Sequence, residues 1–184
     1  MDEWSICERW QFGYCAGSPM PKYFRQIASE YFSMIFKDER EERKNFKYFG
    51  KTIYRAVIPP DSGSLIKFDN LYYSFSKNID GLKQVVVKDK YLRSDIFIIE
   101  AQPFDAIDFQ VIVNNLFGEF PQNRYYKENE VVSKLTIDSI ISIYFLSNAN
   151  DILDYKNKGT PIDKKSCQLK PKSILKKFNL TEVN

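Results

Sequence analysis

The sequence predicts an α+β domain built on an antiparallel β-sheet, and two observations support this class. The first 50 residues favour helices, whereas short β-rich runs follow one another after residue 50. Strands that cluster in one part of a chain, with few helices between them, are typical of antiparallel sheets. A length of 184 residues suits one domain with a sizeable core. We therefore expect a single domain over 1–184, with a helical part at 1–50, a β core at 51–150 and a basic tail at 151–184.

One helix is predicted in detail within the first 50 residues. After Ser18-Pro19, apolar residues recur at intervals of three and four positions, which is the spacing of a helix face that packs against a core. The residues on this face are Phe24, Ile27, Ala28, Tyr31 and Ile35. The mixed-charge run at 37–47, in which Glu39 and Arg43 lie four residues apart, predicts a solvated helix face without chemistry of its own.

The β core contains six predicted strands and one further helix. Turn signals such as the Pro- and Gly-containing stretch at 59–63 separate the strands. The predicted strands cover 52–58, 65–68, 71–76, 95–99, 130–135 and 139–145. A helix is expected at 108–117, with Asp108 as its N-cap.

The composition excludes several classes of enzyme. The chain contains no histidine, which excludes Ser-His-Asp and Cys-His nucleophilic triads and every imidazole general base. Its three cysteines, Cys7, Cys15 and Cys167, are too scattered for a disulfide framework or a zinc site, and we expect no bound metal. The sequence has neither a P-loop nor a Gly-rich dinucleotide-binding turn. Any catalysis must therefore use carboxylates, hydroxyls, Lys or Arg.

The start of the chain and its charge pattern bear on location and partners. The chain opens with acidic residues and no long apolar stretch follows, so we expect no signal peptide and no membrane span, and a cytoplasmic protein. The net charge is +3, but residues 151–184 contribute +4 through eight lysines, and the other 150 residues carry −1. This segment predicts a solvated, partly mobile tail, with contact to phosphates or to an acidic partner as the alternative.

Three short polar features occur in order along the β core. Arg55 lies within a mostly apolar strand, and Ser74 and Ser76 lie two residues apart in a later one. Glu128 and Glu130 then introduce a further β-rich run. Residues two apart on a strand point to the same face, so each pair presents its polar groups side by side. A cleft with one guanidinium, hydroxyls and two carboxylates suits an anionic sugar nucleotide, whereas an Arg–Glu ion pair with incidental serines is the structural alternative.

This order of motifs resembles the R-S-E branch of the mono-ADP-ribosyltransferases, which includes cholera-toxin-like and arginine-specific clostridial enzymes and phage transferases. The match runs from about residue 52 to residue 143, and the branch with histidine in place of the arginine is excluded because the chain has none. The usual S-T-S reads Ser74-Phe75-Ser76, and the 19 residues from Arg55 to Ser74 are a shorter interval than in many relatives. The resemblance implies an ADP-ribosyltransferase-like split antiparallel β-sandwich with N-terminal helices.

The resemblance also implies an NAD-dependent transferase that cleaves the nicotinamide–ribose bond and passes ADP-ribose to a macromolecule, with NAD as its substrate. In this scheme Arg55 anchors the phosphate or ribose region of NAD, and Ser74 and Ser76 complete the binding site. Glu130, held by Ser74, stabilises the oxocarbenium-like charge that develops as nicotinamide leaves. Glu128 orients or deprotonates the acceptor.

The segment just before the carboxylates occupies the place of the target-recognition loop in relatives. Arg124, Tyr125 and Tyr126 are therefore the candidate contacts with the acceptor, and tyrosines that merely cover the core are the alternative. Glu rather than Gln at position 128 is the pattern associated with arginine acceptors, which favours a protein target. RNA or DNA is the second acceptor class, suggested by the lysine-rich segment and the aromatic content.

Two further expectations concern the class and the biological setting of the protein. A non-enzymatic module that binds nucleic acid or a partner protein remains the alternative to an enzyme. The small size resembles that of a toxin, a defence effector or a phage enzyme that acts inside a bacterial cell. An antitoxin or inhibitor protein is then a conceivable partner, and no membrane is involved.

Overall fold

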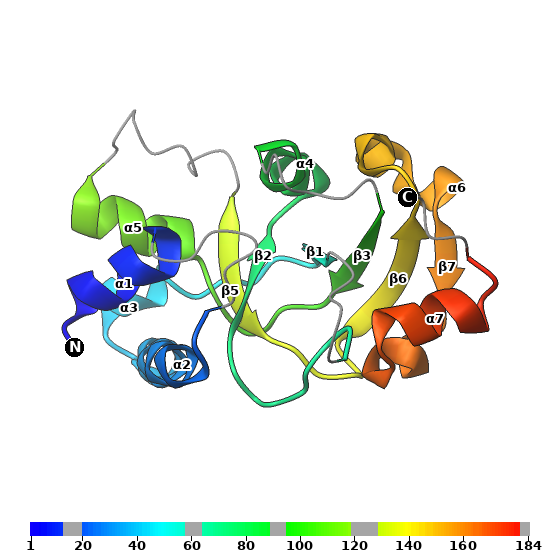
Figure 1. The fold of residues 1–184 in the computed structure, drawn as a ribbon. Helices are drawn as coiled ribbons and strands as arrows, with labels where there is room; N and C mark the ends of the chain where they lie inside the picture. Colours follow the sequence, from blue (N-terminus) through cyan, green and yellow to red (C-terminus); the bar gives the residue numbers. More distant parts are fainter. Residues whose placement is uncertain (13–19, 58–63, 89–94, 119–128, 181–184) are drawn as a thin grey trace.

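The computed structural model describes residues 1–12, 20–57, 64–88, 95–118 and 129–180, and a seven-stranded antiparallel sheet forms its centre. The strands follow the order β4-β5-β2-β1-β3-β6-β7 across the sheet (Figure 1). They are β1 (Ile53–Val57), β2 (Tyr73–Ser76), β3 (Ile96–Ala101), β4 (Phe104–Ile107), β5 (Glu130–Lys134), β6 (Ile140–Leu146) and β7 (Thr160–Ile162). Helices combined with an antiparallel sheet confirm the α+β class.

The sheet is divided between β1 and β2. These strands pair at a single position, Tyr54 with Ser76, whereas β1 pairs with β3 at five positions. Beyond the single pair the two strands diverge, so β4, β5 and β2 form one half-sheet and β1, β3, β6 and β7 form the other. We call this divergence the split.

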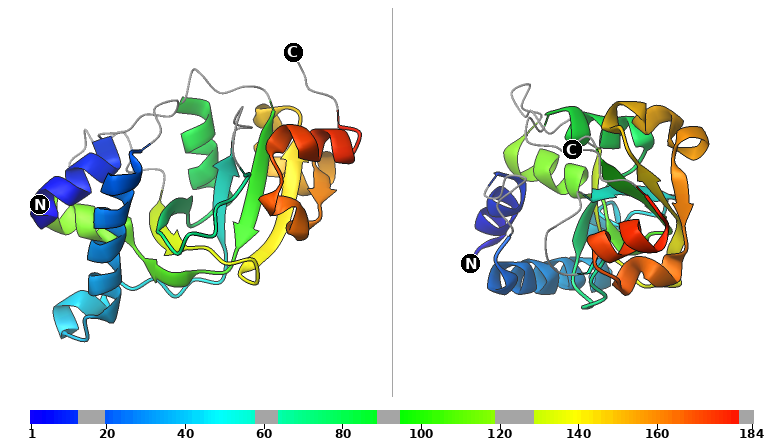
Figure 2. Two further views of the ribbon diagram at one scale, coloured as in Figure 1. Left: turned by 60° about the horizontal axis from the view of Figure 1, so that its bottom comes forward. Right: turned by 45° about the vertical axis from the view of Figure 1, so that its right-hand side comes forward.

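The helices of the described residues gather around the two half-sheets. They are α1 (Glu3–Phe12), α2 (Lys22–Lys37), α3 (Glu41–Lys44), α4 (Ile79–Lys88), α5 (Phe109–Phe117), α6 (Tyr155–Lys158) and α7 (Pro171–Lys177), with the 3-10 helices η2 (Ala149–Asp154) and η3 (Lys164–Gln168). Figure 1 shows α1, α2, α3 and α5 together at the β5 end of the sheet, and α7 beside β6 and β7. The two further views in Figure 2 show the same division.

The hydrophobic core forms three clusters, and their arrangement leaves room for polar groups at the split. One cluster covers one face of both half-sheets and includes Val131 and Phe97. On the opposite face, the cluster around Val132 packs against α1, α2 and α5, and a separate cluster around Ile98 packs against α4 and η2. Adjacent residues belong to different clusters because successive side chains of a strand point to opposite faces. The two clusters of this second face meet at the split.

The predicted N-terminal helix is α2, and one predicted core contact is wrong. The buried residues of α2 are Phe24, Ala28, Ser29, Tyr31, Phe32 and Ile35. Ile27 was predicted to join them, but it is 36% exposed. It lies at the edge of the buried stripe, and Phe32 fills the core instead, with its ring against Trp10 and Phe109.

Two other local predictions concern α5 and the charged run at 37–47. The backbone N–H of Val111 donates to the Asp108 side chain, which confirms the predicted N-cap and helix. The charged run contains the short helix α3, none of whose residues is buried. Glu39 and Arg43 do not pair with each other, because Glu39 binds Lys47 and Arg43 binds Glu3.

The predicted strand at 65–68 is wrong. Leu65 and Ile66 are buried, which explains the apolar pattern. Their backbone N–H groups, however, donate to the carbonyls of Leu169 and Cys167, at η3, and not to a neighbouring strand. The segment therefore packs on the core without joining the sheet.

The regular elements absent from the prediction include β4, β7 and α4. β4 has an irregular register, and its Asp105 adopts a positive φ of 49°. β7 is an edge strand that contains Pro161, which weakens its sequence signal. In α4, Gly81 and three successive valines lower the intrinsic helix propensity, although Leu82 and Val86 are buried at helical spacing.

The segment at 151–184 is folded as far as residue 180, so its description as a solvated tail is wrong. It contains α6, β7, η3 and α7, and it buries Ile152, Tyr155, Ile162 and Ile174. All eight lysines of the segment are exposed. They alternate with the apolar residues because each short element buries only one face. No helix in the described ranges has the length and apolar character that a membrane crossing requires.

Candidate functional site

The candidate site is formed where β2 and β5 pair beside the split. Ser76 lies opposite Glu130 in the register, and Ser74 lies opposite Val132. Because residues two apart share a face, Ser74, Ser76 and Glu130 all point to the same face of the sheet. Ser76 is 2% exposed and Glu130 is 9% exposed, so both lie under the helices of this face.

A hydrogen bond joins the two central residues of the site. The hydroxyl of Ser74 donates to Oε1 of Glu130 over 2.6 Å. Burial raises the pKa of Glu130 above its usual value, and the bonds from Ser74 and Trp10, together with the charge of Arg55, lower it in part. The site therefore holds a buried carboxylate that is costly to ionise and is stabilised by its neighbours.

Arg55 contacts the backbone of Ser74 beside the split. Its neighbour Tyr54 pairs with Ser76, so Arg55 starts from the opposite face of the sheet, beside the rings of Tyr73 and Phe75. Its Nη1 donates to the backbone carbonyl of Ser74 over 2.6 Å. The guanidinium thus binds the same residue whose hydroxyl holds the carboxylate.

A second guanidinium, that of Arg25, lies close to Arg55. The pKa of Arg55 is lowered to about 10, mainly by burial and also by the nearby charge of Arg25, while Tyr73 and Glu130 act in the opposite direction. Arg25 projects from the first turns of α2 and lies over the ring of Tyr73, 5.0 Å from its centroid. Arg55 lies 5.4 Å from the same centroid. Two guanidinium groups that share one tyrosine ring are donors of the kind that bind anionic groups, and the carboxylate of Asp69 accepts a bond from the hydroxyl of the same tyrosine.

Sequence reasoning missed Arg25 and Trp10. The indole Nε1–H of Trp10 donates to Oε1 of Glu130 over 3.0 Å, from a residue 120 positions away. The only local signal for Trp10 is its spacing from Cys7 and Ile6, which places all three on the buried side of α1. Arg25 shows no signal at all, because it lies next to apolar residues on a helix and its contact is with a distant strand.

Part of the predicted site lies outside the described residues. Glu128 and the three predicted target contacts, Arg124, Tyr125 and Tyr126, belong to the stretch 119–128, which the structure does not describe. The first described residue after this stretch, Asn129, has a positive φ of 50°, and its carbonyl accepts a bond from the backbone N–H of Lys77. This contact connects the start of β5 to the end of β2.

The remaining reactive side chains of the described residues form no obvious second centre. These residues include no group of three or more His, Cys, Asp or Glu side chains suited to a metal ion. Cys7 and Cys167 are buried free thiols, and burial raises the pKa of each to about 12. A hollow of about 350 Å³ lies between α1, α3 and α5, and none of the predicted site residues lines it.

Comparisons of the chain with models of protein families, with curated proteins and with solved structures find no match. The functional interpretation therefore depends on the geometry of the site and on the order of its motifs.

Proposed function

We propose that this protein is an NAD-dependent mono-ADP-ribosyltransferase of the R-S-E type. The observation that carries the proposal is the bond between the Ser74 hydroxyl and the buried carboxylate of Glu130, beside the guanidinium of Arg55. The structural alternative of an Arg–Glu ion pair is disfavoured, because no ion pair joins Arg55 to Glu130 although both lie within the described residues. A guanidinium and a buried carboxylate that share a neighbour without forming a direct ion pair favour a binding site.

The fold supports the same proposal. The R-S-E resemblance implies a split antiparallel sheet preceded by helices, and β1 and β2 diverge at the position of Arg55. We infer that the two half-sheets correspond to the split β-sandwich of that family, with the dinucleotide bound along the split.

The proposed reaction breaks the bond between the nicotinamide nitrogen and ribose C1′ of NAD. Nicotinamide leaves with the bonding electron pair, and positive charge develops on the ribose. The ionised carboxylate of Glu130 binds the ribose 2′-hydroxyl and stabilises this charge, as carboxylates do in glycoside cleavage. Ser74 holds the carboxylate in place through its hydroxyl.

The cationic groups of the site would bind the diphosphate of NAD. Arg55 provides several N–H donors at the split, and Arg25 places a second positive charge over the ring of Tyr73, which Arg55 also contacts. An anion between them would offset the mutual repulsion of the two guanidinium groups. Ser76, which lies opposite Glu130 in the register, would belong to the part of the site around the carboxylate.

The acceptor then attacks C1′ and loses a proton, and the resemblance assigns this step to Glu128. Glu at this position favours a protein arginine as the acceptor. The segment 124–126 keeps its proposed role in recognising the target.

One experiment tests the proposal directly. The wild-type protein and Glu130→Gln are incubated with NAD labelled in the adenylate part and with total bacterial protein, and nicotinamide release is followed by chromatography. We expect release and protein labelling by the wild type, loss of both in Glu130→Gln, and mass spectra that place ADP-ribose on arginine. Release by the variant at the wild-type rate would exclude the proposed role of Glu130.

A nucleic acid is the second candidate acceptor, and the surface of the C-terminal segment favours it. η3 and α7, with the residue that precedes α7, present Lys164, Lys165, Lys170, Lys172, Lys176 and Lys177, all of them exposed. Clustered lysines bind phosphate backbones without sequence preference. Parallel incubation with total RNA separates the two classes, because label found only in RNA excludes the protein acceptor.

The Glu130→Gln variant also distinguishes an enzyme from a non-enzymatic binding module. A module would keep its biological effect in Glu130→Gln, because the substitution preserves the size of the side chain and one acceptor oxygen. We expect the effect to be lost while the circular dichroism spectrum stays that of the wild type.

A further inference from the structure

Trp10 lies far from the motifs in sequence, but it contacts their central residue. It belongs to α1, is 7% exposed, and donates its indole N–H to Oε1 of Glu130 over 3.0 Å. A buried indole N–H requires an acceptor, and here the acceptor is the carboxylate of the candidate site.

The two donors to Glu130 share one oxygen. Ser74 and Trp10 both donate to Oε1, and no side chain of the described residues donates to Oε2. Two donors on one oxygen hold that oxygen in place more closely than one donor can, because they approach it from different elements, α1 and β2. Among the described residues the arrangement therefore holds Oε1 and leaves Oε2 without a side-chain donor, as an oxygen that accepts a hydrogen bond from a ligand requires.

The ring of Trp10 is itself held in place by aromatic packing. Its centroid lies 5.0 Å from that of Phe32, with the rings nearly perpendicular, and 6.4 Å from that of Phe109. Phe32 comes from α2 and Phe109 from α5. The indole of α1 therefore packs against two other helices, so its N–H keeps a fixed direction.

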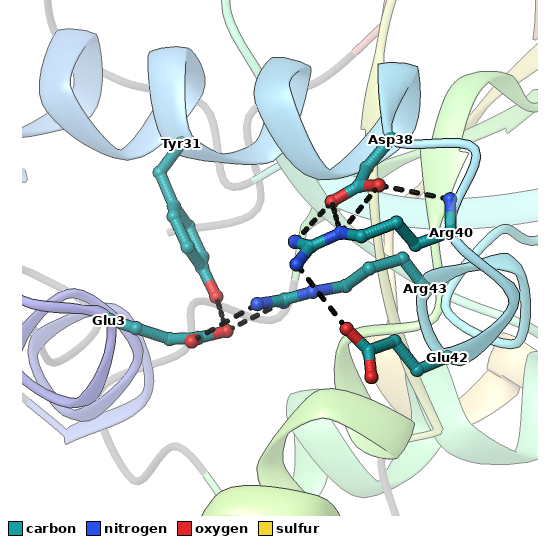
Figure 3. Close-up of polar contacts among 6 residues, drawn as sticks. All are labelled: Glu3, Tyr31, Asp38, Arg40, Glu42 and Arg43. Carbon is teal, nitrogen blue, oxygen red and sulfur yellow. Dashed lines mark hydrogen bonds and ion pairs between the residues drawn. The ribbon is translucent and has the colours of Figure 1, made fainter.

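The start of α1 is anchored by a second polar network. Figure 3 shows the carboxylate of Glu3 between Tyr31 and Arg43, which come from α2 and α3. The Tyr31 hydroxyl donates to Glu3, and the two Arg43 nitrogens donate to its oxygens over 2.8 and 3.4 Å. Although burial acts to raise the pKa of Glu3, the bonds from Arg43 and Tyr31 lower it below the usual value.

Glu3 and Trp10 are seven residues apart, which is close to two helical turns, so both lie on the same side of α1. One anchors the helix to α2 and α3, and the other bonds the carboxylate on β5. Together they fix the distance between the N-terminal helices and the candidate site.

We propose that Trp10 is a positioning residue, which holds the carboxylate of Glu130 through Oε1 so that Oε2 faces the substrate. This inference rests on the proposed function for the identity of the substrate. The contact between Trp10 and Glu130 does not depend on that function and is tested separately.

The first experiment measures the contact by NMR. The chain has two tryptophans, so ¹⁵N-labelled protein gives two indole N–H signals, which the Trp4→Phe variant assigns. We expect the Trp10 signal to shift in Glu130→Gln, and to move as the pH falls through the raised pKa of Glu130, while the Trp4 signal follows neither change. A Trp10 signal that is the same in the wild type and in Glu130→Gln would overturn this inference without affecting the proposed function.

The second experiment measures the effect on catalysis. In Trp10→Phe the aromatic packing is largely kept and only the donor is lost, so circular dichroism should match the wild type. We expect kcat for nicotinamide release to fall about tenfold with little change in KM, since a bond to a charged group is lost. Because the indole bond lowers the pKa of Glu130, the acid limb of the kcat profile should move to higher pH in the variant.

Trp4→Phe is the matched control, since Trp4 lies on the same helix and is 47% exposed. It should keep the wild-type kcat and acid limb. A folded Trp10→Phe with unchanged kcat and an unchanged acid limb would overturn the positioning role. Absence of nicotinamide release by the wild type would instead overturn the proposed function, and with it the catalytic part of this inference.

Discussion

The bond between Ser74 and Glu130 allows a quantitative test of the candidate site. Ser74→Ala removes a hydroxyl that donates to a buried carboxylate over 2.6 Å. Hydrogen bonds to charged groups contribute about 1.5–3 kcal/mol. If Glu130 must be ionised and fixed in the transition state, this loss corresponds to a decrease of roughly 10- to 150-fold in kcat for nicotinamide release. The free energy of unfolding at pH 7 should fall by a similar amount, about 1.5–3 kcal/mol.

A second Ser–Glu bond in the same sheet supplies the control. The hydroxyl of Ser142 on β6 donates to the buried carboxylate of Glu100 on β3, which also binds Tyr155 and Lys156. Two strands, β1 and β3, separate β6 from β2, so this bond lies away from the split. Ser142→Ala should lower the free energy of unfolding, as Ser74→Ala does, but keep the wild-type kcat.

The assays are urea unfolding and initial rates of nicotinamide release for the wild type and both variants. An equal loss of kcat in Ser142→Ala would show that lowered stability, and not the Glu130 contact, limits the activity. A wild-type kcat in Ser74→Ala would refute the reasoning outright, because the bond would then have no part in the transition state.

Two further predictions concern Arg25 and the charge of Glu130. In the proposed complex with NAD, Arg25 and Arg55 face the diphosphate, so Arg25→Gln should raise KM for NAD about tenfold with a smaller change in kcat. Lys37→Gln, at the exposed far end of α2, should leave KM unchanged. Glu130→Gln should raise the free energy of unfolding at pH 7. Burial raises the pKa of Glu130, so the folded state binds a proton at this carboxyl more tightly than the unfolded state does. The protonated carboxyl therefore stabilises the folded wild type at low pH, and this stabilisation is lost as the pH rises through the pKa of the folded state. The difference in free energy of unfolding between Glu130→Gln and the wild type, measured in urea, should therefore narrow toward pH 4.5. A difference that widened on acidification would contradict the raised pKa of Glu130.

The parts of the fold that the sequence predicted are those with a strong local pattern. Apolar spacing predicted α2, and the carboxylate of Asp108 predicted the start of α5. The alternation of side chains on strands placed Ser74 and Ser76 on a common face, and the register of β2 with β5 brought that face to Glu130. Local rules suffice for such features because the residues involved are near neighbours in the chain.

The missed features depend on contacts between distant residues. The bond from Trp10 to Glu130 spans 120 positions, and nothing near Trp10 indicates it. Residues 65–68 have the composition of a strand, but their backbone groups bond to the segment around η3. The C-terminal lysines obscured the alternation of buried and exposed residues, so Ile162 and Ile174 gave too weak a signal to predict a folded segment.

The divergence of β1 from β2 has a consequence for how Arg55 should be interpreted in related chains. Main-chain groups along an interrupted ladder need other partners, and the guanidinium supplies one of them to the carbonyl of Ser74. The side chain thereby bridges the two halves of the domain in the absence of any ligand. A descendant that had lost its activity would still be selected to keep an arginine here. Substitution of Glu130, which is costly to bury, is the better marker of lost function.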